Sequence, residues 1–259
     1  MPIGVCKLCL NARPLQKSHL IPAAMYKYLL DPKKKNDNPV VVGRNITATS
    51  SRQVSHHLLC SGCEDLFNKN GERWMLKQVW NGKTFPLRDR LAVALHLHAF
   101  PSVHVYSGAS AGIDTDKLGY FALSVIWRAA VRTWNTPFGG TTRLLNLGNL
   151  EDPIRMFLLG QGPFPSDIVV MVHVCTDRES IGSFYMPSAV RGNPVPSFGF
   201  QTLGILFRIF VGRTIPPAVR EFCCVRSTRR LLFQRDCSEK TREAFRQLMA
   251  TSRPAKGLQ

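Results

Sequence analysis

Apolar positions in the first third of the chain change from a strand-like to a helix-like spacing at Ser61. Before Ser61, short runs of apolar residues predict strands, and segments rich in Pro, Asn and Asp separate them. After Ser61, apolar side chains recur near helical spacing as far as Val79. The expected elements are a strand over 15–21, one or two helical turns over 23–30, a loop over 31–39, a strand from 40 to 42, a strand over 53–59 and then the helix. The predicted order is strand, long excursion, strand, helix.

Beyond this first helix the pattern is helical and then rich in β-branched and aromatic residues. The segment 81–86 contains Gly and Pro, ends the first helix and is the best candidate for a domain boundary. The expected elements after it are helices over 87–100 and 118–134, strands within 168–174, 182–186 and 198–211, and a helix over 238–249 capped by Ser238. We therefore expect the α+β class, with an N-terminal domain over 1–85 and a mixed helix-then-strand region over 86–259.

Two C-x-x-C pairs stand out among the eight cysteines, Cys6 with Cys9 and Cys60 with Cys63. Four thiolates in two pairs can close a tetrahedral zinc site. The start MPIGVCK lacks an apolar signal segment, so we expect a cytoplasmic protein, whose reducing surroundings favour metal over disulfides. The competing interpretation is two unrelated pairs of thiols. The cysteines at 175, 223, 224 and 237 have no metal-like spacing and predict only small buried apolar groups.

The 259 residues carry a formal net charge of +17, from 34 Lys and Arg against 17 Asp and Glu. This excess favours a polyanionic partner, most commonly nucleic acid, over a merely soluble basic surface. Residues 1–85 hold 13 basic against 5 acidic residues and residues 213–259 hold 11 against 4, whereas 86–212 hold 10 against 8. We therefore expect phosphate contacts through the two ends of the chain. No membrane partner is expected, because the most apolar stretch, 198–211, is short and contains Arg208.

Polar residues that suit hydrolysis lie between and after the cysteine pairs. His19 stands near the end of the first expected strand and could deprotonate a water molecule. Glu64, Asn68 and Glu72 recur every four residues, so they share one helix face and could hold a hard cation through oxygen atoms. The alternative for this stripe is a solvated polar face without a ligand.

The segment from Cys6 to about residue 75 resembles the HNH, or ββα-metal, endonuclease family in its variant with two C-x-x-C pairs, through Ser18-His19 with Pro22 and the cysteines around them. The resemblance implies that His19 is the general base and that the four cysteines hold a structural Zn²⁺. It further implies that a catalytic Mg²⁺ or Mn²⁺ is held by Glu64, Asn68 and Glu72 with help from Ser18. Ser18 and Glu64 depart from the commonest family pattern, which has Asp, Glu or His before the base and His or Asn after the last cysteine.

His56 and His57 stand on the second strand, where this family often has an Asn that orients the base. Strand alternation lets only one of the two point into the site, and we place His57 in the catalytic set beside Ser18 and His19. A plain surface histidine is the alternative.

Two functions remain open. The resemblance implies a metal-dependent endonuclease acting on DNA, with RNA less favoured. Because HNH nucleases frequently occur in bacterial defence systems against phages and plasmids, the resemblance also suggests that setting. The alternative is a zinc-stapled nucleic-acid-binding protein without catalysis. Residues 86–259 would recognise DNA, bind a partner protein, join copies of the chain or hold the nuclease inactive until it is triggered. Within them, the residues Trp127, Arg128, Arg132 and Trp134 favour a core helix with Arg at its rim over a base-stacking surface.

Overall fold

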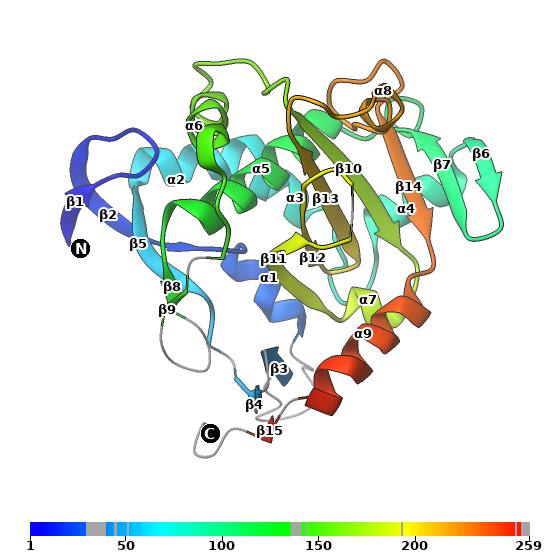
Figure 1. Cartoon of the computed structure of the whole chain (residues 1–259), viewed down its shortest axis with the longest axis horizontal. Coiled ribbons are helices and arrows are strands. Elements are labelled where there is room, and N and C mark those ends of the chain that lie inside the picture. Colours follow the sequence, from blue (N-terminus) through cyan, green and yellow to red (C-terminus); the bar gives the residue numbers. More distant parts are fainter. Residues whose placement is uncertain are drawn as a thin grey trace.

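The N-terminal part of the computed structural model is a small antiparallel sheet followed by a long helix (Figure 1). The structure describes residues 1–29, 40–43, 46–50, 52–135, 141–142, 144–192, 194–251 and 253–254. The sheet has the order β1 (Ile3–Val5), β2 (Ala12–His19), β5 (Ser55–Cys60). The helix runs through α2 (Ser61–Phe67), the π-helical segment η2 (Asn68–Glu72) and α3 (Arg73–Leu76). The predicted order of strand, excursion, strand and helix is confirmed.

The excursion between β2 and β5 begins with helical turns and ends with a β-hairpin. Its elements are α1 (Ala23–Tyr26), the 3-10 turn η1 (Lys27–Leu29), β3 (Val40–Gly43) and β4 (Ile46–Thr49). The loop expected over 31–39 lies outside the described residues. Strand β4 also pairs in parallel with β15 (Arg253–Pro254), so the C-terminal end of the chain returns to the excursion.

A seven-stranded sheet forms the second part of the structure (Figure 1). Its strand order is β11 (Phe184–Val190), β12 (Ser197–Thr202), β13 (Ile205–Val211), β10 (Ile168–Cys175), β14 (Leu231–Arg235), β7 (Val103–Ser107), β6 (His96–Phe100). Strands β10 and β14 pair in parallel and the other neighbours are antiparallel. The α+β class is therefore confirmed.

Helix α5 (Thr115–Val131) joins the two parts. Every residue from Leu118 to Ala130 is buried, as expected for a helix that is covered on all sides. The ring of Phe121 lies 5.7 Å from that of Phe207 in the large sheet. On another side α5 meets η2 at Gly71, where an added Cβ would come within 3.2 Å of the Phe121 backbone. Glycine at position 71 therefore permits a close approach of the two helices.

The remaining helices and short strands surround these layers. They are α4 (Pro86–Val93), β8 (Trp134–Asn135), β9 (Thr141–Thr142), η3 (Gly148–Leu150), α6 (Glu151–Leu158), α7 (Arg178–Ile181), α8 (Pro217–Arg220) and α9 (Ser238–Thr251). One apolar core contains buried side chains from both sides of residue 85, and the domain boundary placed there stays a prediction. In the described ranges no helix is both long and apolar enough to cross a bilayer.

Three elements expected from the sequence have different ends or contain a turn in the structure. The helix expected over 87–100 stops at Val93, and residues 96–100 form β6, because they pair with β7 across a short hairpin. The stretch 198–211 is two strands joined at Leu203 and Gly204, whose positive φ angles of 45° and 81° suit a tight hairpin. Helix α5 ends at Val131, so Trp134 lies in β8 instead. Strands β7 and β14 were not anticipated.

Candidate functional site

The four cysteines of the two C-x-x-C pairs lie together, and their sulfur atoms are all within 4.8 Å of one another. Cys6 and Cys9 come from the loop between β1 and β2, Cys60 ends β5, and Cys63 lies in the first turn of α2. The distance from Cys9 Sγ to Cys60 Sγ is 3.9 Å. A tetrahedral site with Zn–S bonds of about 2.3 Å separates its sulfur atoms by about 3.8 Å. These four residues could therefore hold a metal ion such as zinc.

Backbone hydrogen bonds shape the loop that carries the first cysteine pair. The Cys6 N–H donates to Asn11 O at 2.9 Å and the Leu10 N–H donates to Cys6 O at 2.9 Å. Leu10 has a φ of 62°, which reverses the chain directly after Cys9. The Cys60 N–H donates to Cys6 Sγ at 3.3 Å. The Cys63 thiol donates to the same sulfur, which lowers the pKa of Cys6 to about 4 and raises the pKa of Cys63. These hydrogen bonds favour the thiolate form of Cys6, the form in which a cysteine binds a metal ion.

Ser18 connects the end of β2 to the helix that follows β5. Its side chain is buried, and its hydroxyl donates to Glu64 Oε1 in α2. The Ser18 hydroxyl oxygen accepts the Leu59 N–H of β5 at 3.2 Å. Burial raises the pKa of Glu64, an effect opposed by the Ser18 hydrogen bond and by Arg128 and reinforced by Glu72. Ser18 therefore holds the Glu64 carboxyl group in place. The Ser18 hydroxyl acts as a hydrogen-bond donor to Glu64 and as an acceptor from Leu59.

His19 is the last residue of β2 and is half-buried. Burial lowers the pKa of its imidazole, and the positive charges of Lys17 and Arg128 lower it further, whereas Glu72 raises it. A histidine that is neutral near pH 7 has a ring nitrogen free to accept a proton. His19 therefore has the protonation state that a general base needs.

Arg128 in α5 contacts both β2 and the helix that follows β5. Its side chain is 1% exposed, yet its guanidinium lies 2.7 Å from Glu72 Oε1. It also donates to the main-chain oxygen of His19 at 2.8 Å and to that of Ser124 at 3.2 Å. The ring of Phe67 lies 5.3 Å from the guanidinium carbon. The expectation that Arg128 would lie at the rim of a core helix was wrong, because these partners satisfy its charge inside the protein.

Glu72 is the last residue of η2, and its side chain is 14% exposed. Asn68 begins that segment and is half-buried. Wide π turns are often found at functional sites, because they change which residues of a helix face a neighbour. Here Gly71 brings η2 against α5, and Glu72 reaches Arg128. No feature of the sequence around Arg128 marks it as a partner of Glu72, 56 residues earlier in the chain.

The oxygen ligands expected for a catalytic ion do not form a closed cation site by themselves. Where the structure describes the chain, His, Cys, Asp and Glu atoms gather within 4.8 Å in two groups of three or more, and neither contains His19, Glu64 or Glu72. Glu64 accepts a hydrogen bond from Ser18, and Glu72 forms an ion pair with Arg128. An ion held here would need water or substrate oxygens to complete its coordination, which Mg²⁺ commonly accepts.

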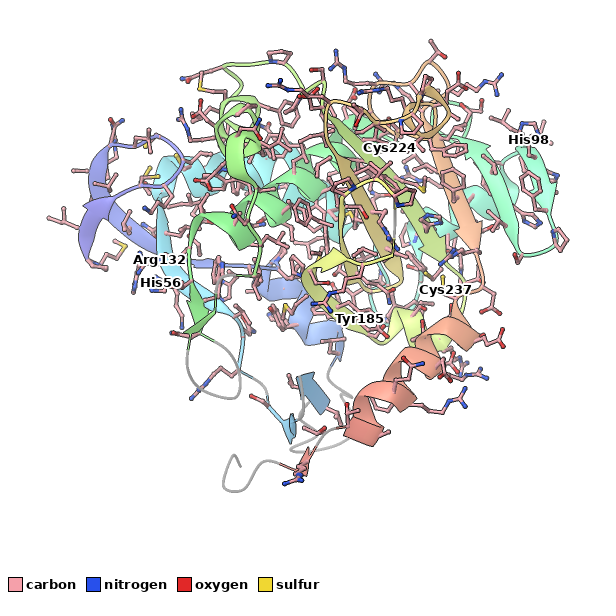
Figure 2. All side chains as sticks on the ribbon, viewed as in Figure 1. His56, His98, Arg132, Tyr185, Cys224 and Cys237 are labelled. Carbon is pink, nitrogen blue, oxygen red and sulfur yellow. The ribbon has the colours of Figure 1, made fainter. Side chains whose placement is uncertain are left out.

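His56 and His57 differ in their surroundings. His57 is exposed and lies opposite Lys17 in the ladder, whereas His56 lies opposite Ser18 and is half-buried. The His56 Nε2 atom is 2.9 Å from an Arg132 guanidinium nitrogen at the end of α5, and Figure 2 shows the two side chains next to each other. The catalytic role assigned to His57 stays a prediction, and His56 is the one of the pair that contacts α5.

Comparisons with known proteins provide no relative. No family model, no curated protein and no solved structure matches the chain.

Proposed function

We propose that the protein is a metal-dependent endonuclease of the HNH type that hydrolyses phosphodiester bonds in DNA. The observation that carries the proposal is the position of His19 at the end of β2, where the charge of Glu72 acts on its imidazole. Its neighbour Ser18 bonds Glu64 on the helix that follows β5. The antiparallel β2 and β5 followed by a helix give the ββα order that the resemblance implies. The four cysteines, with zinc as the proposed ion, would fix the loop before β2 to the start of that helix.

In this proposal the neutral His19 imidazole accepts a proton from water at a ring nitrogen, which produces the nucleophile for attack at phosphorus. Arg128 bonds the His19 main chain and Glu72 and thereby fixes the base relative to the helix. Ser18 orients Glu64 through its hydroxyl group. Ser18 thus acts as a positioning residue, because its hydroxyl contacts Glu64 and Leu59.

Glu64 and Glu72, with Asn68 between them, would hold Mg²⁺ or Mn²⁺. Two carboxylates and an amide are the hard oxygen ligands that such ions prefer. A neighbouring carboxylate contributes to the raised pKa of Glu64, and a cation beside the pair would relieve this repulsion. The bound ion would polarise the scissile phosphate and stabilise the leaving oxygen.

The charge of the chain supports a nucleic-acid substrate. A net charge of +17 attracts polyanions, and both the site-bearing segment 1–85 and the segment 213–259 are strongly basic. We take DNA as the substrate and bacterial defence as the setting from the family resemblance alone. Residues 86–259 would serve for recognition of DNA, for a partner protein or for a second copy of the chain.

One observation favours the second candidate function, a zinc-stapled nucleic-acid-binding protein without catalysis. Both glutamates of the helix already have partners within the protein: Glu64 pairs with Ser18, and Glu72 pairs with Arg128. In a non-catalytic protein these bonds would serve only to hold the helix against β2 and α5.

Plasmid cleavage separates the two functions. Supercoiled DNA is incubated with the zinc-loaded wild type and with His19→Ala, in Mg²⁺, in Mn²⁺ and in chelator, and DNA binding is measured on the same samples. The nuclease proposal expects nicked or linear DNA only with wild type and a divalent ion, while both proteins bind DNA. Binding by wild type without cleavage in either ion would establish the second function instead.

A further inference from the structure

A second pair of cysteines lies at the end of the large sheet, far along the chain from the C-x-x-C pairs. Strands β10 and β14 are parallel neighbours, with Cys175 paired to Arg235, so their C-terminal ends meet at one edge. Cys175 is the last residue of β10, and Cys237 lies just before α9. The Sγ atoms of Cys175 and Cys237 are 2.8 Å apart. That distance exceeds a disulfide bond by only about 0.8 Å.

The surroundings of Cys237 favour its thiolate. The Cys175 thiol donates a hydrogen bond to Cys237 Sγ and the Arg235 Nε–H donates another at 3.2 Å, which together lower the pKa of Cys237 to about 7 against the effect of burial. The same hydrogen bond and burial raise the pKa of Cys175. Thiolates rather than thiols react with oxidants, so Cys237 is the reactive member and Cys175 is the neighbour poised to resolve its product. Figure 2 shows Cys237 between the sheet and α9.

Asp177 lies close enough to the two sulfur atoms that the three residues could hold a metal ion. Its carboxylate is already engaged, however. Oδ1 accepts the Ser180 N–H at 2.7 Å and caps α7, while Oδ2 accepts the Cys237 N–H at 2.8 Å. These bonds hold the main chain at Cys237 close to the end of β10. The arrangement favours a role for Asp177 in bringing the two cysteines together.

We propose that Cys175 and Cys237 form a reversible disulfide when the protein meets a peroxide. The Cys237 thiolate attacks one peroxide oxygen, the O–O bond breaks, and the other oxygen departs as hydroxide. Cys237 is then a sulfenic acid. Cys175 then attacks the sulfenic sulfur, its proton joins the departing hydroxyl group as water, and the S–S bond forms. The peroxide gains the two electrons that the two thiols lose, and an added dithiol reverses the oxidation.

The bond would fix the base of the C-terminal arm, defined here as α9 with β15. Helix α9 already contacts α7 through Thr241 Oγ1, 3.0 Å from Ser180 Oγ, and through Arg242, 2.8 Å from Glu179. Strand β15 pairs with β4 of the excursion that separates the two strands of the candidate site. The arm therefore links the oxidised cysteines to that excursion. This inference does not depend on the proposed nuclease function.

The test is a disulfide map of the zinc-loaded full chain after graded hydrogen peroxide. Free thiols are alkylated, and trypsin then releases Cys175 in residues 156–178 and Cys237 in residues 236–240. We expect the two peptides to appear joined, lighter by two hydrogen atoms than their sum, and to separate after dithiothreitol. The peptide 221–226, with Cys223 and Cys224, serves as the internal control and is expected to stay alkylated at the same peroxide dose.

Two results would overturn the proposal. One is that the joined peptide is absent at every dose while both cysteines stay alkylated or Cys237 is oxidised alone to the sulfinic acid. The other is a zinc content above one per chain that falls in Cys237→Ser and not in the matched variant Cys223→Ser, because it would make the pair a metal site. The wild-type peptide map decides the question even if Cys237→Ser does not fold.

Discussion

The guanidinium of Arg128 lies 2.7 Å from Glu72 Oε1, although the two residues come from different helices and Arg128 is only 1% exposed. A buried charge is tolerated when it is paired and its remaining hydrogen-bonding groups are satisfied. Arg128 meets both conditions, because its other nitrogens donate to the main-chain oxygens of His19 and Ser124. The ion pair therefore holds the end of β2, the π segment and α5 in one arrangement.

Replacing Arg128 by Met is expected to destabilise the fold by about 3 kcal/mol, because Glu72 would be left without its cation in a largely buried position. Adding Glu72→Gln to Arg128→Met should recover about 1 kcal/mol or more of that loss, because the uncompensated charge is then removed as well. Urea unfolding of the four proteins of this double-mutant cycle measures the coupling. Strictly additive effects of the two substitutions would contradict the pairing.

Gly71 and Gly62 lie in the same continuous helix and offer a matched pair of substitutions. A Cβ at Gly71 would approach the Phe121 backbone to 3.2 Å and the Tyr120 ring to 3.1 Å, whereas at Gly62 nothing lies within 4 Å. Gly71→Ala should therefore destabilise the protein by about 1–3 kcal/mol, because the backbone of α5 must move. Gly62→Ala should leave stability unchanged or raise it by up to about 1 kcal/mol through helix propensity. Thermal unfolding of both variants checks this, and equal effects would mean that the helices do not meet at Gly71.

The cysteine cluster predicts one zinc ion per chain. Cys60→Ser should reduce the zinc content of purified protein severalfold and lower its thermal midpoint, because structural zinc contributes directly to folding. Cys223→Ser is the matched control, since Cys223 is also buried but lies outside the cluster. Elemental analysis of the two variants beside wild type measures the effect. The same zinc content in Cys60→Ser and in Cys223→Ser would show that the four cysteines do not bind zinc.

The pKa of His19 is expected below its ordinary value of 6.5, with burial as the main cause and Lys17 as the next. Lys17 is exposed, so Lys17→Met removes one positive charge without emptying the core, and the pKa of His19 should rise. Lys7→Met, also at an exposed position, is the control and should leave it unchanged. NMR titration of the His19 ring measures both. An unaltered pKa in Lys17→Met would mean that the lysine does not act on the imidazole.

The same shift fixes the sign of a pH effect on stability. Because the folded protein holds His19 with a lowered pKa, the unfolded chain binds more protons between the two pKa values. The contribution of His19 to the free energy of unfolding is therefore present above about pH 6.5 and is lost as the pH falls through the pKa of the folded state. Glu64, whose pKa is raised, acts oppositely: its contribution is present below pH 4.5 and is lost as the pH rises through its folded value.

The sequence predicted the parts of the site that carry a recognisable local motif. The two C-x-x-C spacings indicated that Cys6, Cys9, Cys60 and Cys63 could meet, although 51 positions separate Cys9 from Cys60, and the helix after Ser61 followed from its apolar period. Arg128 could not be predicted, because its burial depends on Glu72 being brought close by the contact at Gly71. The strand at 96–100 was missed for a related reason: pairing with 103–107, and not its own composition, decides its structure.

If His19 is the general base of a nuclease, its removal must slow plasmid cleavage. Initial rates in Mg²⁺ and in Mn²⁺ are compared for wild type, His19→Ala and the matched variant His98→Ala, whose histidine is exposed on β6. We expect the rate to fall at least about a hundredfold in His19→Ala, as for removal of a general base, and to stay close to wild type in His98→Ala. Equal cleavage rates for His19→Ala and wild type would show that His19 is not the base.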